Sequence, residues 1–307
     1  MKIVFAGTPE FARKPLRALH AAGFEVVAVL TQPDKPQGRK GILTPPPMKT
    51  VAEELGISVL QPARLKEDCS ALKALKADCM VTCAYGQILT QEVLDLFPKG
   101  VWNIHASLLP AYRGAAPIPR VIIDGCAETG VTIMKTDIGL DTGDMLLKQE
   151  LAIEDTDTAE TLSNKLSACG AELIVTAMKQ IEDGNYTLIE QGDGAFTCKK
   201  VQRTQVDFTK SAREVSCLIR GLSPAPLCFG TVGDLVFNFY FAQVVEGSFD
   251  APAGTVVCAS PKQGLIVSCG EGAVRITELQ AAGGKRMSAR DFLNGGKLKE
   301  GARFDLP

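Results

Sequence analysis

One of the two histidines in the chain stands where it could take part in catalysis. His105 follows the apolar run from Val101 to Ile104, at the point where a strand leads into a loop. Ligands of open α/β sheets bind at the ends of the parallel strands, and imidazole exchanges protons near neutral pH. His20 lies instead at the expected end of a helix, where an imidazole complements the helix C-terminus. His105 is therefore the candidate acid-base group.

Asn103 shares this strand end with His105. Side chains alternate along a strand, so Asn103 and His105 lie on the same side and Ile104 lies on the other. An amide donor and a proton carrier are thus expected at one edge of one crevice. The spacing alone fits a hydrogen-bonded structural pair about equally well.

Asp141 is a third candidate, in the turn-rich segment from Gly139 to Asp144 between two expected strands. Gly139 and Gly143 are expected to take backbone conformations closed to other residues. An aspartate between glycines more often caps its own loop, although Asp144, directly before the next strand, fits that role better. The local sequence leaves both readings of Asp141 open.

In the first half of the chain, short apolar runs alternate with amphipathic segments, which predicts a parallel sheet covered by helices. The first helix is expected to have Thr8 as its N-cap and Pro9 at its first position. A long helix is expected at residues 158–181. The expected strands are residues 2–6, 25–30, 58–61, 79–84, 101–104, 131–135 and 145–149.

The second half has a different pattern, after a stretch without a clear period at residues 185–205. Short strands separated by Gly, Pro and Asp turns suit a small closed barrel. We expect an α/β domain at 1–184, a linker at 185–202 and a C-terminal domain at 203–307. The latter's expected elements are helices at 211–221 and 288–293 and strands at 235–245, 254–259, 264–269 and 273–279.

Composition indicates a globular protein, with 46% hydrophobic and 22% charged residues. The net charge of −2 argues against a surface coated in positive charge, although a local basic face is compatible with it. Ten cysteines without a CxxC pair are expected to be reduced and mostly buried. We expect a cytoplasmic protein, since the first residues enter a strand at once and no apolar run approaches the roughly 20 residues that span a bilayer.

The motifs of several common enzyme classes are missing from the chain. The loop after the first strand lacks the GxGxxG spacing, which disfavours dinucleotide binding. No Walker, HExxH or GxSxG motif occurs, and no metal is expected. Acyl or proton transfer run by side chains alone is the chemistry that these residues favour.

Longer motifs around the three candidates resemble the folate-dependent formyltransferases. The resemblance covers the full chain, densely in residues 1–150 and thinly after 185. Its motifs are too long for chance to be a good explanation. They are the run Asn103 to Pro110 followed by Tyr112 to Ile118, the segment Thr129 to Met134 with Gly139 to Asp144, and the opening Phe5 to Phe11.

The resemblance implies a Rossmann-like catalytic domain with a mostly parallel sheet, followed by an OB-fold-like β-barrel that binds tRNA. The family's catalytic trio corresponds to Asn103, His105 and Asp141. Asn103 would donate to the oxyanion and His105 would carry a proton. Asp141 would orient the imidazole and favour its charged form. The formyl donor would be 10-formyltetrahydrofolate.

Folate contacts also follow from the resemblance. The family's folate-binding stretch corresponds to Ser107, Leu108, Leu109 and Pro110, and its pterin-contacting loop corresponds to Tyr85, Gly86, Gln87, Ile88 and Leu89.

The second domain and a long loop at residues 31–41 resemble the branch of the family whose acceptor is initiator methionyl-tRNA. Pro and Gly would give this loop an extended path, and its cations would meet phosphates or bases. A solvated charged loop is the alternative. The protein is expected to act as a monomer in a bacterial cytoplasm. The expected tRNA contacts are Lys35, Arg39, Lys40, Lys200 and Arg203.

Three alternatives remain from the sequence. An enzyme of the same fold could act on another amine, such as that of a nucleotide sugar, or could hydrolyse 10-formyltetrahydrofolate. A non-enzymatic RNA-binding protein is the alternative from a different class. Nothing in RNA binding requires Asn103, His105 and Asp141 together, which weighs against that last reading.

Overall fold

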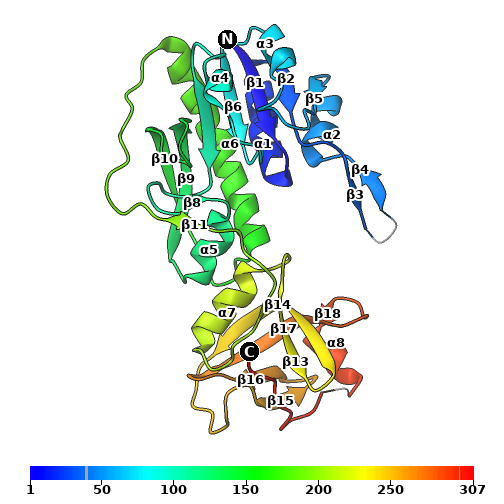
Figure 1. Ribbon diagram of the computed structural model, residues 1–307. Helices are drawn as coiled ribbons and strands as arrows, with labels where there is room; N and C mark the ends of the chain where they lie inside the picture. Colours follow the sequence, from blue (N-terminus) through cyan, green and yellow to red (C-terminus); the bar gives the residue numbers. More distant parts are fainter. Residues whose placement is uncertain (39–40, 297) are drawn as a thin grey trace. The chain divides into compact units, whose positions relative to one another are not determined.

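A computed structural model describes residues 1–38, 41–296 and 298–307 (Figure 1). The chain forms two compact units. The first, which we call the α/β unit, comprises residues 1–114, 129–151 and 163–197, and the second, the β unit, comprises 115–128, 152–162 and 198–307. The chain thus passes between the units more than once. The single linker and the domain limits expected from the sequence stay a prediction.

The α/β unit is built on a seven-stranded sheet in the order β10-β9-β7-β6-β1-β2-β5. The five strands from β7 to β5 run parallel, and β9 is antiparallel to β7. The expectation of a mostly parallel sheet is confirmed. The strands are β1 (Lys2–Gly7), β2 (Glu25–Leu30), β5 (Ser58–Leu60), β6 (Cys79–Cys83), β7 (Val101–His105), β9 (Glu128–Lys135) and β10 (Met145–Ala152).

Apolar runs explain why these segments form inner strands. Ile3 to Ala6 in β1 have no exposed surface, as expected for parallel strands covered on both faces by helices. In α6, Gly170 lets the helix approach the sheet, because a Cβ there would lie 2.9 Å from Ile104 Cγ2 in β7. The helices are η1 (Glu10–Ala12), α1 (Arg13–Ala21), α2 (Pro47–Glu54), α3 (Ser70–Ala74), α4 (Gln91–Leu94) and α6 (Ala159–Asp183).

Thr8 does not cap the first helix, so this expectation was wrong. A 3-10 turn, Glu10–Ala12, precedes α1, and Ala12 stands at the N-cap without a side-chain bond. Thr8 Oγ1 donates instead to the Tyr85 carbonyl at 2.8 Å. The hydroxyl therefore joins the loop after β1 to the loop after β6.

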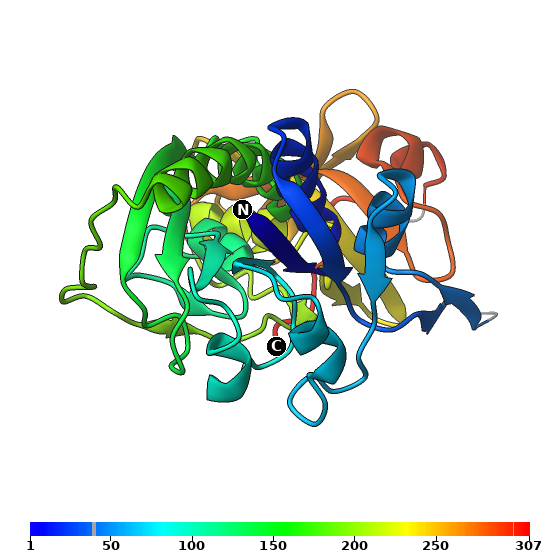
Figure 2. The same ribbon diagram turned by 90° about the horizontal axis from the view of Figure 1, so that it is seen from above.

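The loop after β2 contains a hairpin, β3 (Lys35–Gln37) paired antiparallel with β4 (Ile42–Thr44). It extends away from the sheet of the α/β unit (Figure 1, Figure 2). Ile42 and Leu43 expose 64% and 62% of their surface on it. The sequence predicted an extended path here but not paired strands.

The β unit holds one long sheet, with β12-β13-β14-β17-β16-β15 as its path and β18 paired to β17. Residues near the C-terminus join the two sides of this path, since Phe304 N donates to Gly254 O and Asp305 N donates to Thr231 O. Phe208, Phe237 and Phe239 pack with Phe304 in the core. A β-rich C-terminal domain was expected and is confirmed.

The remaining elements complete the chain, and none of the described helices is long and apolar enough to cross a membrane. Ser211 caps α7 and Glu214 completes a capping box. The elements are β8 (Arg113–Gly114), α5 (Pro117–Ile123), β11 (Thr197–Cys198), β12 (Thr204–Gln205), α7 (Ala212–Gly221), β13 (Cys228–Val232), β14 (Leu235–Val245), β15 (Val256–Ser260), β16 (Gly264–Ser268), β17 (Ala273–Ala281), β18 (Met287–Ser288) and α8 (Ala289–Asn294).

Candidate active site

The carboxyl end of β7 brings Asn103 and His105 to one edge of the sheet. Asn103 pairs in register with Thr82 of β6, and His105 pairs with Thr132 of β9. His105 is 5% exposed and Asn103 is half-buried. The backbone at both positions is therefore fixed by pairing with a neighbouring strand.

The two ring nitrogens of His105 face different oxygens. Nε2 lies 3.0 Å from the Tyr112 carbonyl oxygen, and Nδ1 lies 3.7 Å from Oδ1 of Asp141. A carbonyl can only accept, so Nε2 carries the hydrogen. The Tyr112 carbonyl thus orients the ring, while Nδ1 faces the carboxylate across a gap longer than a hydrogen bond.

Asn103 is fixed through its amide oxygen. Thr82 Oγ1 donates to Asn103 Oδ1 at 2.9 Å, and Asn103 Nδ2 donates to Asp141 Oδ1 at 3.4 Å. An amide nitrogen carries two hydrogens. One N–H of Asn103 is directed at Asp141, and the other is left for a different acceptor.

Asp141 joins the two residues of β7 from the loop between β9 and β10. Its Oδ2 accepts from the Gly114 backbone N–H at 2.8 Å, and its side chain is 17% exposed. Its φ of 52° lies in the left-handed region, which a non-glycine residue adopts at a cost of roughly 1 kcal/mol or more. The contacts around this carboxylate must therefore offset local strain.

Asp137, rather than Asp144 or Asp141, caps this loop. Its Oδ1 accepts from Gly139 N at 3.0 Å and from Thr142 Oγ1 at 2.7 Å. The sequence favoured Asp144 for this role, which was wrong. Asp141 is thereby left to face the strand end.

Gly139 and Gly143 do not take the unusual backbone conformations that were expected of them. Asp141 has the positive φ in this loop, and neither glycine does. A Cβ at Gly143 would lie 1.8 Å from the Lys135 carbonyl oxygen. These positions need glycine for space, because the loop lies directly against its neighbours.

The stretch expected to bind folate is largely packed into the fold. Ser107 is fully buried and donates through Oγ to the Ala111 carbonyl at 2.7 Å. Leu109 is fully buried, whereas Leu108 and Pro110 are half-buried. The roles of all four residues stay a prediction.

The loop expected to contact the pterin has both buried and exposed residues. Tyr85 is 4% exposed, and burial raises its pKa to about 12. Gln87 is occupied by Leu65 N at 2.7 Å and the Pro62 carbonyl at 2.9 Å. Gly86 is exposed, Ile88 is 80% exposed and Leu89 is half-buried. Of this loop's side chains, Ile88 offers the most surface to a ligand.

The cations expected to contact tRNA are exposed where the structure describes them. Lys35 lies in β3, while Arg39 and Lys40 lie outside the described residues. Lys200 is exposed, and Arg203 donates to Asn238 Oδ1 at 2.7 Å with its guanidinium 4.0 Å above the Phe229 ring centre. Arg203 is therefore held in place on the β unit.

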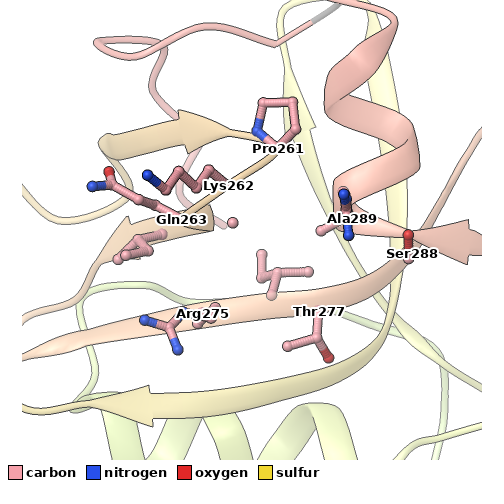
Figure 3. A pocket seen from close by; sticks show the side chains of 11 residues that line it. Pro261, Lys262, Gln263, Arg275, Thr277, Ser288 and Ala289 are labelled. Atoms are coloured by element: carbon pink, nitrogen blue, oxygen red, sulfur yellow. The ribbon is translucent and has the colours of Figure 1, made fainter.

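The β unit also has a groove that the sequence did not indicate (Figure 3). Lys262 and Gln263 of the β15–β16 turn lie on one side, and Arg275 and Thr277 of β17 lie opposite. Its volume is about 620 Å³. No sequence motif links Lys262 and Arg275, since they line one groove only because β16 pairs with both β15 and β17. Among the described residues, no group of three or more His, Cys, Asp or Glu side chains could hold a metal ion.

Two family models match the chain. The formyl transferase model covers residues 1–178, and the model of the formyl transferase C-terminal domain covers residues 199–297. With the α/β fold and the polar cluster at the end of β7, these matches define a formyl transferase of two domains. Closer relatives specify the group within this class.

Proteins named methionyl-tRNA formyltransferase align over nearly the whole chain. The one from Chromobacterium violaceum is 47% identical over 100% of both chains. Those from Janthinobacterium sp. (strain Marseille) and Neisseria meningitidis serogroup B are each 46% identical, over 98% and 99% of this chain and 99% and 100% of theirs. The chain belongs to the methionyl-tRNA formyltransferase family.

Solved structures share the fold at lower identity. An N-formyltransferase from Helicobacter canadensis, crystallised with folinic acid and dTDP-3-aminofucose, has a TM-score of 0.69 at 18% identity, over 94% of this chain and 100% of its own. HypX from Aquifex aeolicus in complex with tetrahydrofolic acid has a TM-score of 0.68 at 15% identity, over 95% of this chain and 47% of its own. The fold expected from the sequence is confirmed.

Proposed function

We propose that this chain transfers the formyl group of 10-formyltetrahydrofolate to the amino group of methionine on initiator methionyl-tRNA, giving N-formylmethionyl-tRNA for translation initiation. The observation that carries the proposal is the cluster of Asn103, His105 and Asp141 at the end of β7. Formyl transfer to an amine needs an oxyanion donor and a proton carrier. The names of relatives 46% to 47% identical support the acceptor.

The reaction begins when the neutral amine attacks the formyl carbon. An α-amino group is partly neutral near neutral pH. As the new C–N bond forms, the carbonyl electron pair moves onto oxygen. The free N–H of Asn103 Nδ2 donates to this oxyanion, since its other hydrogen is directed at Asp141. One such donor is worth about 10²- to 10³-fold in rate.

His105 then moves the proton. Nδ1 accepts it from the attacking nitrogen, because Nε2 already donates to the Tyr112 carbonyl. The imidazolium lies beside the Asp141 carboxylate, which stabilises its charge. The same proton passes to N10 of the folate as the C–N10 bond breaks, and tetrahydrofolate leaves. No covalent bond to the enzyme is needed.

Exposed apolar side chains in the loops after β6 and β9 support a flat aromatic donor such as folate. Ile88 follows β6, whose Thr82 pairs with Asn103, and it is 80% exposed. Leu140, next to Asp141, is 62% exposed. Apolar surfaces of this kind suit stacking against a ring. Relatives of the same fold were crystallised with folinic acid and tetrahydrofolic acid.

Two regions with basic side chains, exposed at Lys35 and Lys262 and half-buried at Arg275, support a tRNA acceptor. The β3–β4 hairpin carries Lys35, and the groove of the β unit has Lys262 and Arg275 on facing sides. Phosphate contacts from Lys and Arg supply most of the affinity for nucleic acid. We propose that these regions contact tRNA phosphates, and that the protein acts as a monomer in the bacterial cytoplasm.

The deciding experiment offers the protein three acceptors with 10-formyltetrahydrofolate. Charged initiator tRNA should become formylated. A nucleotide-sugar amine and water should react far more slowly, measured as formylated sugar and as tetrahydrofolate released without acceptor. Equal or greater turnover with the sugar amine or with water would overturn the proposed acceptor. Binding of tRNA without any turnover would favour a non-enzymatic RNA-binding protein.

A further inference from the structure

Gln191 lies in the segment after α6 that has little regular structure, yet it is tied to the loop that carries Asp141. The segment is anchored to β10 by an antiparallel bridge between Ile189 and Met145, with N–H to carbonyl distances of 2.8 and 2.9 Å. This bridge sets Gln191 two residues further on, beside the loop that ends at Asp144. All of these residues belong to the α/β unit.

The Gln191 side chain uses every hydrogen-bonding position that an amide has. Nε2 donates to the backbone carbonyls of Asp141 at 2.9 Å and Gly143 at 2.7 Å. Oε1 accepts from Arg113 Nε at 3.0 Å and from Arg113 Nη2 at 2.7 Å. A glutamine amide offers two donors and one oxygen with two lone pairs. This side chain is therefore fully committed within the protein and has no group left for a substrate.

The contacts fall on the two segments that hold the candidate trio. Asp141 is the residue with a positive φ of 52°, so its loop needs outside contacts to hold its conformation. Arg113 stands between Tyr112, whose carbonyl accepts from His105, and Gly114, whose N–H donates to Asp141. The planar amide of Gln191 thus links the Asp141 loop to the segment around Arg113, and both segments contact the imidazole of His105.

We infer that Gln191 is a positioning residue, which holds the Asp141 carboxylate against His105 and Asn103 without touching substrate. The two donated bonds fix the loop backbone on either side of Thr142, and the accepted bonds fix Arg113 and its neighbours. A small displacement of a catalytic group can cost about 10²-fold in rate. The inference rests on the proposed formyl transfer for its kinetic part only.

Gln191→Glu separates the bonds that Gln191 accepts from Arg113 from the bonds that it donates to the loop. A carboxylate still accepts from Arg113, but it places an oxygen where the amide nitrogen donated to the Asp141 and Gly143 carbonyls. Gln191→Ala removes both sets of bonds. Glu190→Ala is the matched control, because Glu190 is exposed and is the adjacent residue.

The kinetic test measures kcat and the KM for both substrates. Gln191→Glu and Gln191→Ala should each lower kcat by about 10- to 100-fold with little change in either KM. Glu190→Ala should match the wild type. A wild-type kcat in Gln191→Glu, or a loss of kcat no larger than the unfolded fraction found by thermal melting, would overturn the inference.

A second readout does not depend on turnover. The backbone amide proton of Gly114, which donates to Asp141, should change its NMR shift and exchange faster with solvent in Gln191→Glu. An unchanged Gly114 signal would also overturn the positioning role. If the wild-type enzyme formylates none of the acceptors, the proposed function is wrong. The Gly114 signal would still test whether Gln191 positions Asp141.

Discussion

The strand end of the α/β unit and the groove of the β unit hold their polar groups in opposite ways. At the end of β7, each side chain of the trio has a fixed partner, as in the pairs of Asn103 with Thr82, of His105 with the Tyr112 carbonyl and of Asp141 with the Gly114 N–H. In the groove, Lys262 and Arg275 face each other across an open space, and none of the described lining residues is acidic.

This difference reflects what each region has to do. Catalysis requires groups held within a fraction of an ångström, which buried hydrogen bonds provide. Attraction of a polyanion tolerates loose positions, because Coulomb forces between exposed charges act over about 8 to 10 Å in physiological salt. Substitutions at the strand end should therefore change turnover, and substitutions in the groove should change affinity and its salt dependence.

The largest effect is expected at the strand end. His105→Ala and Asp141→Asn should each lower kcat by about 10²-fold or more while the fold is kept, since each removes part of the proton path. Turnover of charged initiator tRNA at saturating substrate measures this, with circular dichroism as the check on folding. Near-wild-type kcat in either variant would show that the trio is a structural cluster and does not take part in catalysis.

A smaller effect should follow from the residue behind Asn103. Thr82→Val keeps the shape of the side chain but removes the hydroxyl that donates to Asn103 Oδ1. The lost bond is worth about 0.5 to 1.5 kcal/mol, so kcat should fall by up to about tenfold as the Asn103 amide is freed to turn. Thr82→Ser keeps the hydroxyl and should stay close to wild type. Equal losses in both variants would instead point to packing at this position.

Most strands, and the placement of Asn103 and His105, were predictable because they follow from local pattern. The strand expected at residues 25–30 is β2 (Glu25–Leu30), and the one expected at 235–245 is β14 (Leu235–Val245). Alternation correctly put Asn103 and His105 on one edge, since a strand has a period of two whatever surrounds it. Burial of most cysteines was also expected, and seven are buried.

The partners of these residues could not be predicted, because they depend on contacts between distant segments. The carbonyl of Tyr112 orients His105, and a backbone carbonyl has no signature in the sequence. Gln191 contacts the loop 48 to 50 residues before it, from a stretch without any hydrophobic period. Asp137 caps the loop, because the geometry of the loop, and not the residue type, determines which of the nearby aspartates can accept its hydrogen bonds.

The smallest effect on turnover is expected in the groove. The double variant Lys262→Ala with Arg275→Ala should leave kcat at saturating tRNA unchanged and weaken tRNA binding. Each lost phosphate contact lowers the slope of log affinity against log salt by about 0.9, so the slope should fall by nearly two. Arg286→Gln is a suitable control, because Arg286 is already paired with Glu278 at 2.6 Å and should contribute little to RNA binding. An unchanged slope in the double variant would show that the groove does not bind tRNA. A lower kcat would show that the groove also affects turnover, against the division of roles between the two regions.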